Sequence, residues 1–187
     1  MDPRMTEGEQ NLLLLQKLIP REEKLYVWCY NSDGDMPASS CPEEEEMIFD
    51  QAFRLLGGLT QALSFAESPE NEKPVIIGSP IGMQWAVTFE AERKRELIFV
   101  IGPVFYSAPL ESQLRVALRP YMNSTKNAAW ASNLYKLLPT LPVMSYAIFT
   151  RYVMMVHNTL TGEQLGMDAL SSALPQEAGT VPAHAEQ

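Results

Sequence analysis

The chain has 187 residues, which is enough for one well-cored domain and short for two. Lys and Arg together number 14 and Asp and Glu number 23, so the formal net charge is -9 at pH 7. That charge repels the phosphates of nucleic acids, so the chain alone is expected to bind DNA or RNA poorly. Hydrophobic residues make up 46% of the chain, which is ordinary for a globular protein and excludes wholesale disorder.

The two cysteines and the hydropathy pattern indicate a cytoplasmic protein. Cys29 and Cys41 form no CxxC pair and are expected to be reduced thiols. No apolar run reaches the roughly 18 residues needed to span a bilayer, so no membrane partner is expected. Residues 1–10 are polar and do not resemble a signal peptide.

The first element is predicted to be a helix over residues 6–19. Thr6 and Glu9 fit a capping box, and Pro20 ends the segment. Apolar residues follow the cap at helical spacing: Leu12, Leu15, Leu18 and Ile19. A helix with four consecutive leucines would either cover the back of a sheet or pair with a second copy.

A β-hairpin is predicted next. Residues 25–30 are rich in aromatic and β-branched side chains, which favour a strand. The Asp33-Gly34 pair is typical of a tight turn, and residues 35–40 would form the returning strand. Alternation places Tyr26, Trp28 and Tyr30 on one face of the first strand and Leu25, Val27 and Cys29 on the other.

Residues 40–67 are predicted to be helical. Ser40 would cap the helix, with Pro42 in its first turn and Glu43 in the capping-box position. The acidic run 43–46 suits a helix N-terminus, where the helix dipole favours negative charge. Gly57 and Gly58 interrupt the apolar face and predict a kink or a close backbone approach.

Three strands follow. Residues 75–79 and 97–101 are apolar, and the second run is expected to be central in the sheet because both of its faces are apolar. Between them, Met83, Trp85, Val87 and Phe89 alternate with Gln84, Ala86, Thr88 and Glu90, which predicts a strand with one buried face. The charged residues 92–95 are expected to form a solvated turn.

The remainder is predicted to be helical. One helix would begin at Ser107 and end at Pro120, and a second, around Trp130, would stop before Pro139. The longest would begin at Pro142 and run to about Leu160, with Gly162 as its terminator. The composition then changes to Ala, Pro, Gly, Thr and Gln, which is typical of a linker.

This order predicts an α+β fold with a PAS-like (profilin-like) antiparallel five-stranded sheet, a crossing helix, an N-terminal helix and C-terminal helices. The domain organisation would be an N-terminal helix and connector over 1–22, the PAS-like domain over 23–165, and a linker or tail over 166–187. In such domains the sheet curls around a pocket that the crossing helix closes.

Catalytic and metal-binding motifs are not found, so the chain is not expected to be an enzyme. His184 lies in the tail, and His157 has no acidic or cysteine partner at three or four positions along its helix. His157 is therefore interpreted as either a hydrogen-bonded or surface histidine, or a polar contact in a pocket.

Aromatic and sulfur-containing side chains in the sheet and the last helix give the candidate ligand-binding residues. Small-ligand pockets are mostly apolar with a few polar tips, and Trp and Tyr supply both. The alternative is that these residues simply form the core. The candidate set is Trp28, Tyr30, Met83, Trp85, Phe99, Tyr106, Tyr146, Met154 and His157. No cofactor can be named.

The last helix carries a wide apolar arc. One stripe contains Tyr146, Phe149, Val153, Val156 and Leu160, and a second contains Met144, Ile148, Tyr152 and Met155. An arc this wide indicates either deep burial within the domain or pairing with a partner helix. Pairing would give a homodimer.

Three short stretches resemble the N-terminal sensory region of bacterial AraC-type transcriptional regulators. They are Gly102-Pro103-Val104-Phe105-Tyr106-Ser107, Leu141-Pro142-Val143-Met144-Ser145 and His157-Asn158-Thr159-Leu160-Thr161-Gly162-Glu163. The resemblance extends over about 24–165 and implies regulation of transcription. In that family a sensor domain precedes a basic helix-turn-helix module, and this chain departs from the pattern because no such module lies within it. DNA would be bound only through a module outside this chain.

The leading hypothesis is a sensory domain that binds a small molecule and signals through the helix at 142–160 to that module. The alternative is a dimerisation or protein-interaction module without a ligand.

Overall fold

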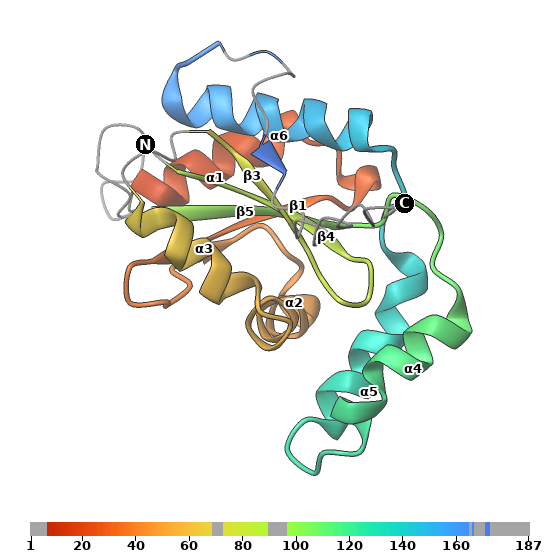
Figure 1. Cartoon of the computed structure of the whole chain (residues 1–187). Helices are drawn as coiled ribbons and strands as arrows, with labels where there is room; N and C mark the ends of the chain where they lie inside the picture. The colour runs from red at the N-terminus through yellow and green to blue at the C-terminus, as the bar shows by residue number, and fades with distance from the viewer. Residues whose placement is uncertain (1–6, 69–72, 90–96, 165, 167–170, 173–187) are drawn as a thin grey trace, which may run out of the picture.

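The computed structural model describes residues 7–68, 73–89, 97–164, 166 and 171–172. Within these ranges the chain has an α+β fold, in which a sheet lies between two layers of helices (Figure 1). The strand order is β2-β1-β5-β4-β3-β6, and the first five of these strands pair antiparallel, as predicted. Their bounds are β1 (Tyr26–Asn31), β2 (Ala38–Ser39), β3 (Val75–Gly78), β4 (Gln84–Phe89) and β5 (Leu97–Val104).

The predicted hairpin is confirmed as β1 paired with β2, although β2 has only two residues. Gly34 supplies the left-handed residue of the turn, with φ 83°. The prediction that Ser40 caps the next helix is wrong. Its Oγ accepts a hydrogen bond from the Val27 N–H at 2.8 Å, and Pro42 occupies the N-cap position without a side-chain hydrogen bond. Ser40 therefore closes the hairpin instead of starting the helix.

The helical segment between the hairpin and the other strands is two helices, α2 (Glu43–Leu55) and α3 (Gly58–Glu67). Gly57 separates them in a left-handed conformation, with φ 85°. A Cβ on Gly58 would lie 2.4 Å from the ring of Phe53, so a glycine is needed for the close approach of the two helices. Both expectations for the glycine pair, a kink and a close approach, are confirmed.

The prediction that β4 has one buried face is wrong, because both of its faces are buried. Trp85 and Val87 point towards α2 and α3, and Ala86 and Thr88, on the other face, are fully buried as well. The helix α6 (Tyr146–Thr161) covers that second face. β5 is central, as predicted, between β1 and β4. Residues 92–95 lie outside the described residues.

Two of the C-terminal helices, α4 and α6, begin later than predicted. α4 (Glu111–Met122) starts four residues after Ser107 and continues two residues beyond Pro120. α5 (Ala128–Leu137) passes into the 3₁₀ turn η2 (Leu138–Thr140). Pro142 does not open α6, because Val143 forms a bridge with Phe105 and Ser145 caps the helix by accepting the Ile148 N–H at 3.3 Å. Gly162 ends α6 in a left-handed conformation, as predicted.

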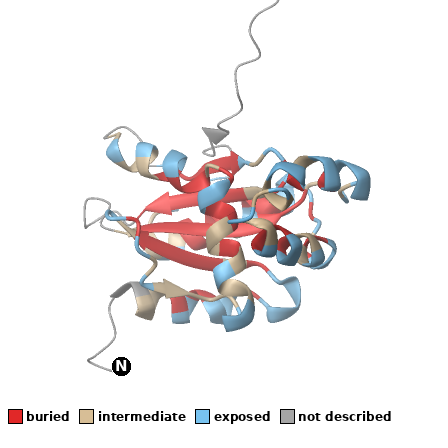
Figure 2. Ribbon diagram, turned by 90° about the horizontal axis from the view of Figure 1, so that it is seen from below, coloured by how far each residue is buried: buried red, intermediate tan, exposed pale blue. Residues whose placement is uncertain are grey.

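Helices pack on both sides of the sheet and form two cores, shown as the buried residues of Figure 2. One core lies between the sheet and α2 to α5. The other lies between the sheet and α1 (Glu7–Leu18) with α6. α1 therefore covers the back of the sheet, as one of its two interpretations predicted, although Thr6 of the proposed cap lies outside the described residues. Leu13, Leu14 and Leu18 remain exposed.

Part of the segment predicted to be a linker is ordered against the sheet: β6 (Ser171–Ser172) pairs with β3 in parallel. Residues 167–170 and 173–187 of the predicted tail lie outside the described residues. In the ranges that the structure describes, no helix combines the length and the apolar composition that crossing a membrane requires.

Candidate functional site

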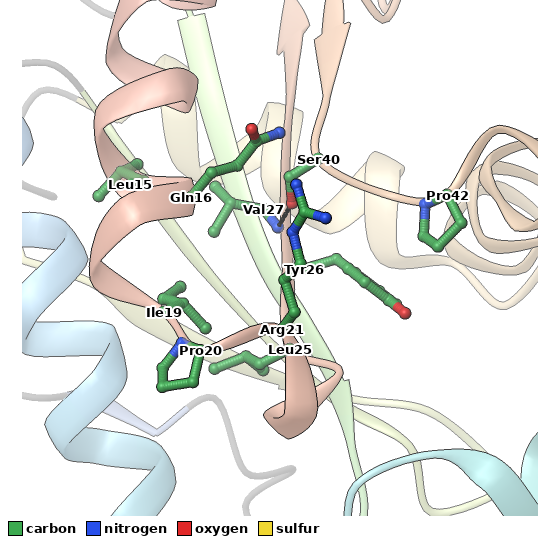
Figure 3. Close-up of a pocket in the computed structure, with 10 residues that line it drawn as sticks. All are labelled: Leu15, Gln16, Ile19, Pro20, Arg21, Leu25, Tyr26, Val27, Ser40 and Pro42. Carbon is green, nitrogen blue, oxygen red and sulfur yellow. Dashed lines mark hydrogen bonds between the residues drawn. The ribbon is translucent and has the colours of Figure 1, made fainter.

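A pocket of about 380 Å³ opens between the C-terminal end of α1, the start of β1 and the connection from β2 to α2 (Figure 3). Its volume lies within the range of small-molecule sites. Pro20 ends α1, and the chain then turns through the 3₁₀ segment η1 (Arg21–Glu23) and the left-handed Lys24 into β1. This sharp turn brings the last turn of α1 alongside the first residues of β1.

The floor of the pocket is apolar. Leu15 and Ile19 come from α1, and Leu25 and Val27 come from the start of β1. All four are buried and belong to the core between the sheet and the layer of α1 and α6. The floor is therefore a firmly packed surface, held by the same contacts that fix α1 on the sheet.

Three polar side chains meet above this floor. In Figure 3 the side chains of Gln16 and Arg21 are directed towards Ser40. Ser40 Oγ accepts the Val27 N–H, and its hydroxyl proton is still available to donate to a ligand. No ion pair of Arg21 and no hydrogen bond of the Gln16 side chain is found among the described residues. The arrangement can therefore donate hydrogen bonds from an amide, a guanidinium and a hydroxyl to one acceptor group.

Tyr26 and Pro42 form the side of the pocket that faces α2. Burial raises the pKa of Tyr26 to about 12, and the nearby carboxylate of Glu45 adds to the increase. The phenol is thus protonated at neutral pH and donates towards Glu45. Its ring contacts Phe49 of α2 with 5.8 Å between centroids. Tyr26 is held by α2 and gives this side of the pocket a fixed shape.

Four of the predicted ligand-binding residues lie on the face of the sheet that α2 covers. They are Trp28, Tyr30, Met83 and Trp85, and each is at most 1% exposed. The ring of Phe53 from α2 occupies the space among the three aromatic ones: its centroid lies 6.0 Å from Trp28, 5.6 Å from Tyr30 and 5.2 Å from Trp85. These residues form a packed aromatic core, which was the stated alternative to a pocket.

Hydrogen bonds also fix this aromatic core. Trp28 Nε1 donates to the Tyr30 hydroxyl at 3.0 Å, and that hydroxyl donates to Asp50 Oδ1 at 2.7 Å. Burial and the hydrogen bond to Asp50 raise the pKa of Tyr30 well above its usual range. Asp50 in turn pairs with Arg54 at 2.9 Å. The polar tips of Trp28 and Tyr30 are therefore occupied by protein partners.

The other five predicted residues lie on the opposite side of the sheet or beside it. Phe99 is fully buried under α1 and α6. Tyr106 and Tyr146 contact each other with ring centroids 5.8 Å apart, and Tyr146 is 44% exposed. Met154 and His157 are buried on α6. The structure thus divides the nine residues between the two sides of the sheet, and none of them lines the pocket of Figure 3.

His157 joins α6 to the sheet. Its Nδ1 lies 2.6 Å from Thr88 Oγ1 of β4, and its Nε2 lies 3.2 Å from Glu163 Oε2. Glu163 is six positions further along the chain, and the left-handed Gly162 turns it back towards the histidine. The predicted hydrogen-bonded histidine therefore has its acidic partner just beyond the helix end. Thr88 and His157 are each at most 1% exposed, so the pair is a structural link between layers.

Sequence reasoning missed the polar residues of the pocket. Gln16 and Arg21 belong to no motif, and the residues around Ser40 predict a helix cap in place of a pocket. The one available signal was the break at 20–24, where a proline and four charged residues separate an apolar helix from an apolar strand. A break of this kind places the end of the helix next to the start of the strand.

In the described ranges, no group of three or more His, Cys, Asp and Glu side chains could hold a metal ion. The buried Cys29 and the half-buried Cys41 form no disulfide. Comparison of the chain with protein-family models, with curated proteins and with solved structures finds no match.

Proposed function

We propose that this chain is a regulatory sensor domain that binds a small molecule in the pocket between α1, β1 and Ser40. The observation that carries the proposal is the convergence of Gln16, Arg21 and Ser40 over a buried apolar floor. Apolar walls with a few convergent polar groups are the usual composition of small-ligand sites. The binding site in this proposal differs from the aromatic set expected from the sequence.

The signal would pass from the pocket through α1 to α6. Leu15 and Ile19 line the pocket and also share a core with Phe149 and Val153 of α6. A ligand that holds the end of α1 against β1 would favour one packing of α1 on α6, which is a population shift between two arrangements. Among the described residues, α6 is the helix that precedes the segment that would lead to an attached effector.

The effector in this proposal is a DNA-binding module outside this chain. The order of hairpin, crossing helices, three-stranded meander and C-terminal helices is compatible with a PAS-like sensor. The three stretches that resemble AraC-type regulators support the same assignment. Ligand binding would then control transcription by changing how two attached modules are placed.

A metabolite screen by thermal shift tests the function. Gln16→Trp is expected to fill the pocket from an exposed position, and Leu13→Trp adds the same side chain on the same helix away from the pocket. A compound that raises the melting temperature of the wild type and of Leu13→Trp, and not of Gln16→Trp, supports the proposal. If every stabilising compound acts equally on both variants, the pocket is not the binding site.

Pairing of two copies through α1 and α6 is a second candidate function. Six large apolar side chains of this layer are exposed by 44–51%: Leu13, Leu14, Leu18, Val143, Tyr146 and Ile148. α1 contacts α6 on the same side of the sheet, so a second copy could cover both helices with its own pair. Exposed apolar side chains that gather on one face are typical of interaction surfaces.

Equilibrium sedimentation tests the pairing. The wild type is expected to be a dimer at about 100 µM, and Leu14→Glu with Ile148→Glu is expected to be a monomer because each charge would be buried in the interface. Val116→Glu, at an exposed position on α4, is the matched control and should leave the dimer intact. A monomeric wild type at that concentration contradicts this candidate.

A further inference from the structure

The pocket of Figure 3 carries a single charged side chain, that of Arg21. No ion pair of Arg21 is found in the described ranges, although the chain as a whole has a net charge of -9. A guanidinium presents its N–H groups in a planar fork that matches a carboxylate. An unpaired arginine at the mouth of a pocket in an acidic protein is therefore suited to a ligand with one negative charge.

Two of the nearby acidic side chains, Glu45 and Glu23, interact with other residues. Glu45 interacts with the Tyr26 hydroxyl, on the side of the pocket that faces α2. Glu23 lies near Tyr152 of α6. Burial raises the pKa of Tyr152, and the negative charge of Glu23 adds to the increase. Neither glutamate lines the pocket, and neither does Glu22. The positive charge of Arg21 therefore makes the pocket favour a negatively charged ligand.

The neighbours of Arg21 complete an acceptor site. The Gln16 amide and the Ser40 hydroxyl point to the same region as the guanidinium and add two uncharged hydrogen-bond donors. Below them the surface of Leu15, Ile19, Leu25 and Val27 offers no polar side chain. A ligand that satisfies both parts has an anionic head and an apolar body.

We propose that the pocket binds a small amphipathic monocarboxylate, with the carboxylate at Gln16, Arg21 and Ser40 and the apolar body on the floor. This inference rests on the proposed function and specifies its ligand class. One cation matches one negative charge, whereas a phosphate group carries more negative charge than Arg21 alone can neutralise. The pocket volume of about 380 Å³ suits a molecule with one aromatic ring or a short alkyl chain.

Paired probes test the charge requirement. Octanoate and phenylacetate are compared with their uncharged amides, octanamide and phenylacetamide, by calorimetric titration of the full chain. Each acid is expected to bind about tenfold or more tightly than its amide, because hydrogen bonds to a charged acceptor are the stronger ones. The affinity of the acids is also expected to fall as salt is added.

Variants of Arg21 locate the effect. Arg21→Gln is expected to weaken octanoate binding about tenfold and to leave octanamide unchanged. Lys17→Gln makes the same change of net charge at an exposed position that does not line the pocket, and should leave both affinities unchanged. Equal losses in the two variants would mean that only the overall charge acts, which overturns the carboxylate site.

The remaining outcomes separate this inference from the proposed function. If acids and amides bind equally and Gln16→Trp blocks both, the pocket is a ligand site and the carboxylate class is wrong. If neither acid binds the wild type, the carboxylate class is wrong, and the metabolite screen decides the function independently. Acid binding that Gln16→Trp does not reduce places the site elsewhere and overturns both.

Discussion

Phe53→Ala should strongly destabilise the domain, because the Phe53 ring fills the space where the aromatic residues would otherwise line a cavity. The ring is fully buried and lies within 6.0 Å, between centroids, of Trp28, Tyr30 and Trp85. Truncation of a buried phenylalanine costs about 3–5 kcal/mol. Three lost aromatic contacts, each about 0.5–1.5 kcal/mol beyond the buried area, favour the upper part of that range.

Urea unfolding at equilibrium measures the loss. We expect the free energy of unfolding to fall by about 4–5 kcal/mol and, for a domain of this size, the melting temperature to fall by about 8–20 °C. Met47→Ala is the control: it lies on the same helix, is 69% exposed, and should change the free energy by less than about 0.5 kcal/mol. A loss below about 1 kcal/mol for Phe53→Ala would show that the ring is not packed. Trp28, Tyr30 and Trp85 would then again be candidates for lining a ligand pocket.

Two further predictions concern the link to α6 and the response to alkali. Thr88→Val removes the hydroxyl next to His157 Nδ1 and should lower the free energy of unfolding by about 1–3 kcal/mol. Thr60→Val, at an exposed position, is the control and should not lower it. Equal effects of the two substitutions would exclude a stabilising hydrogen bond between Thr88 and His157. Burial raises the pKa of Cys41 from 9.0, and that of Tyr26 from 10.0, to about 12. The folded state therefore keeps protons that the unfolded state loses, and the free energy of unfolding should fall as the pH rises from about 9 to 12. Constant stability over that interval would contradict the burial of both groups.

Much of the fold could be predicted from the sequence because the local signals agree with the tertiary contacts. The Asp33-Gly34 turn, the kink at Gly57 and the terminator Gly162 each depend on backbone conformations that few residues other than glycine adopt. The errors come from contacts between distant segments. The alternation of large apolar residues with smaller or polar ones in β4 could not show that α6 covers Ala86 and Thr88. Small residues fit a solvent-exposed face of a strand as well as a face packed closely against a helix.

The starts of helices were harder to predict for the same reason. Ser40 has the composition of a cap, but the N–H of Val27, thirteen positions earlier, is its partner. Pro142 suits the first turn of a helix, yet its carbonyl accepts the Phe105 N–H and keeps the chain extended up to Ser145. In both places a backbone group from another element competes with the local pattern.

The candidate site was the least predictable part. Tyrosine and tryptophan are common both in pockets and in cores. Here the packing of the Phe53 ring against Tyr30 and Trp85 decides for a core, and that packing is not visible in the sequence. The pocket of Figure 3 depends on the exposed Gln16 of α1, the exposed Arg21 of η1 and the half-buried Ser40 after β2, which only the folded chain brings together. Exposed polar residues without a motif give no signal of this kind.

A nitrogen-proton correlation NMR titration of the full chain with octanoate tests the central claim most directly. We expect the largest shift changes at the backbone amides of residues 15–27 and of Ser40, with smaller ones in α6. Changes centred on Trp85 and Phe53, or an absence of change at every amide, would contradict it.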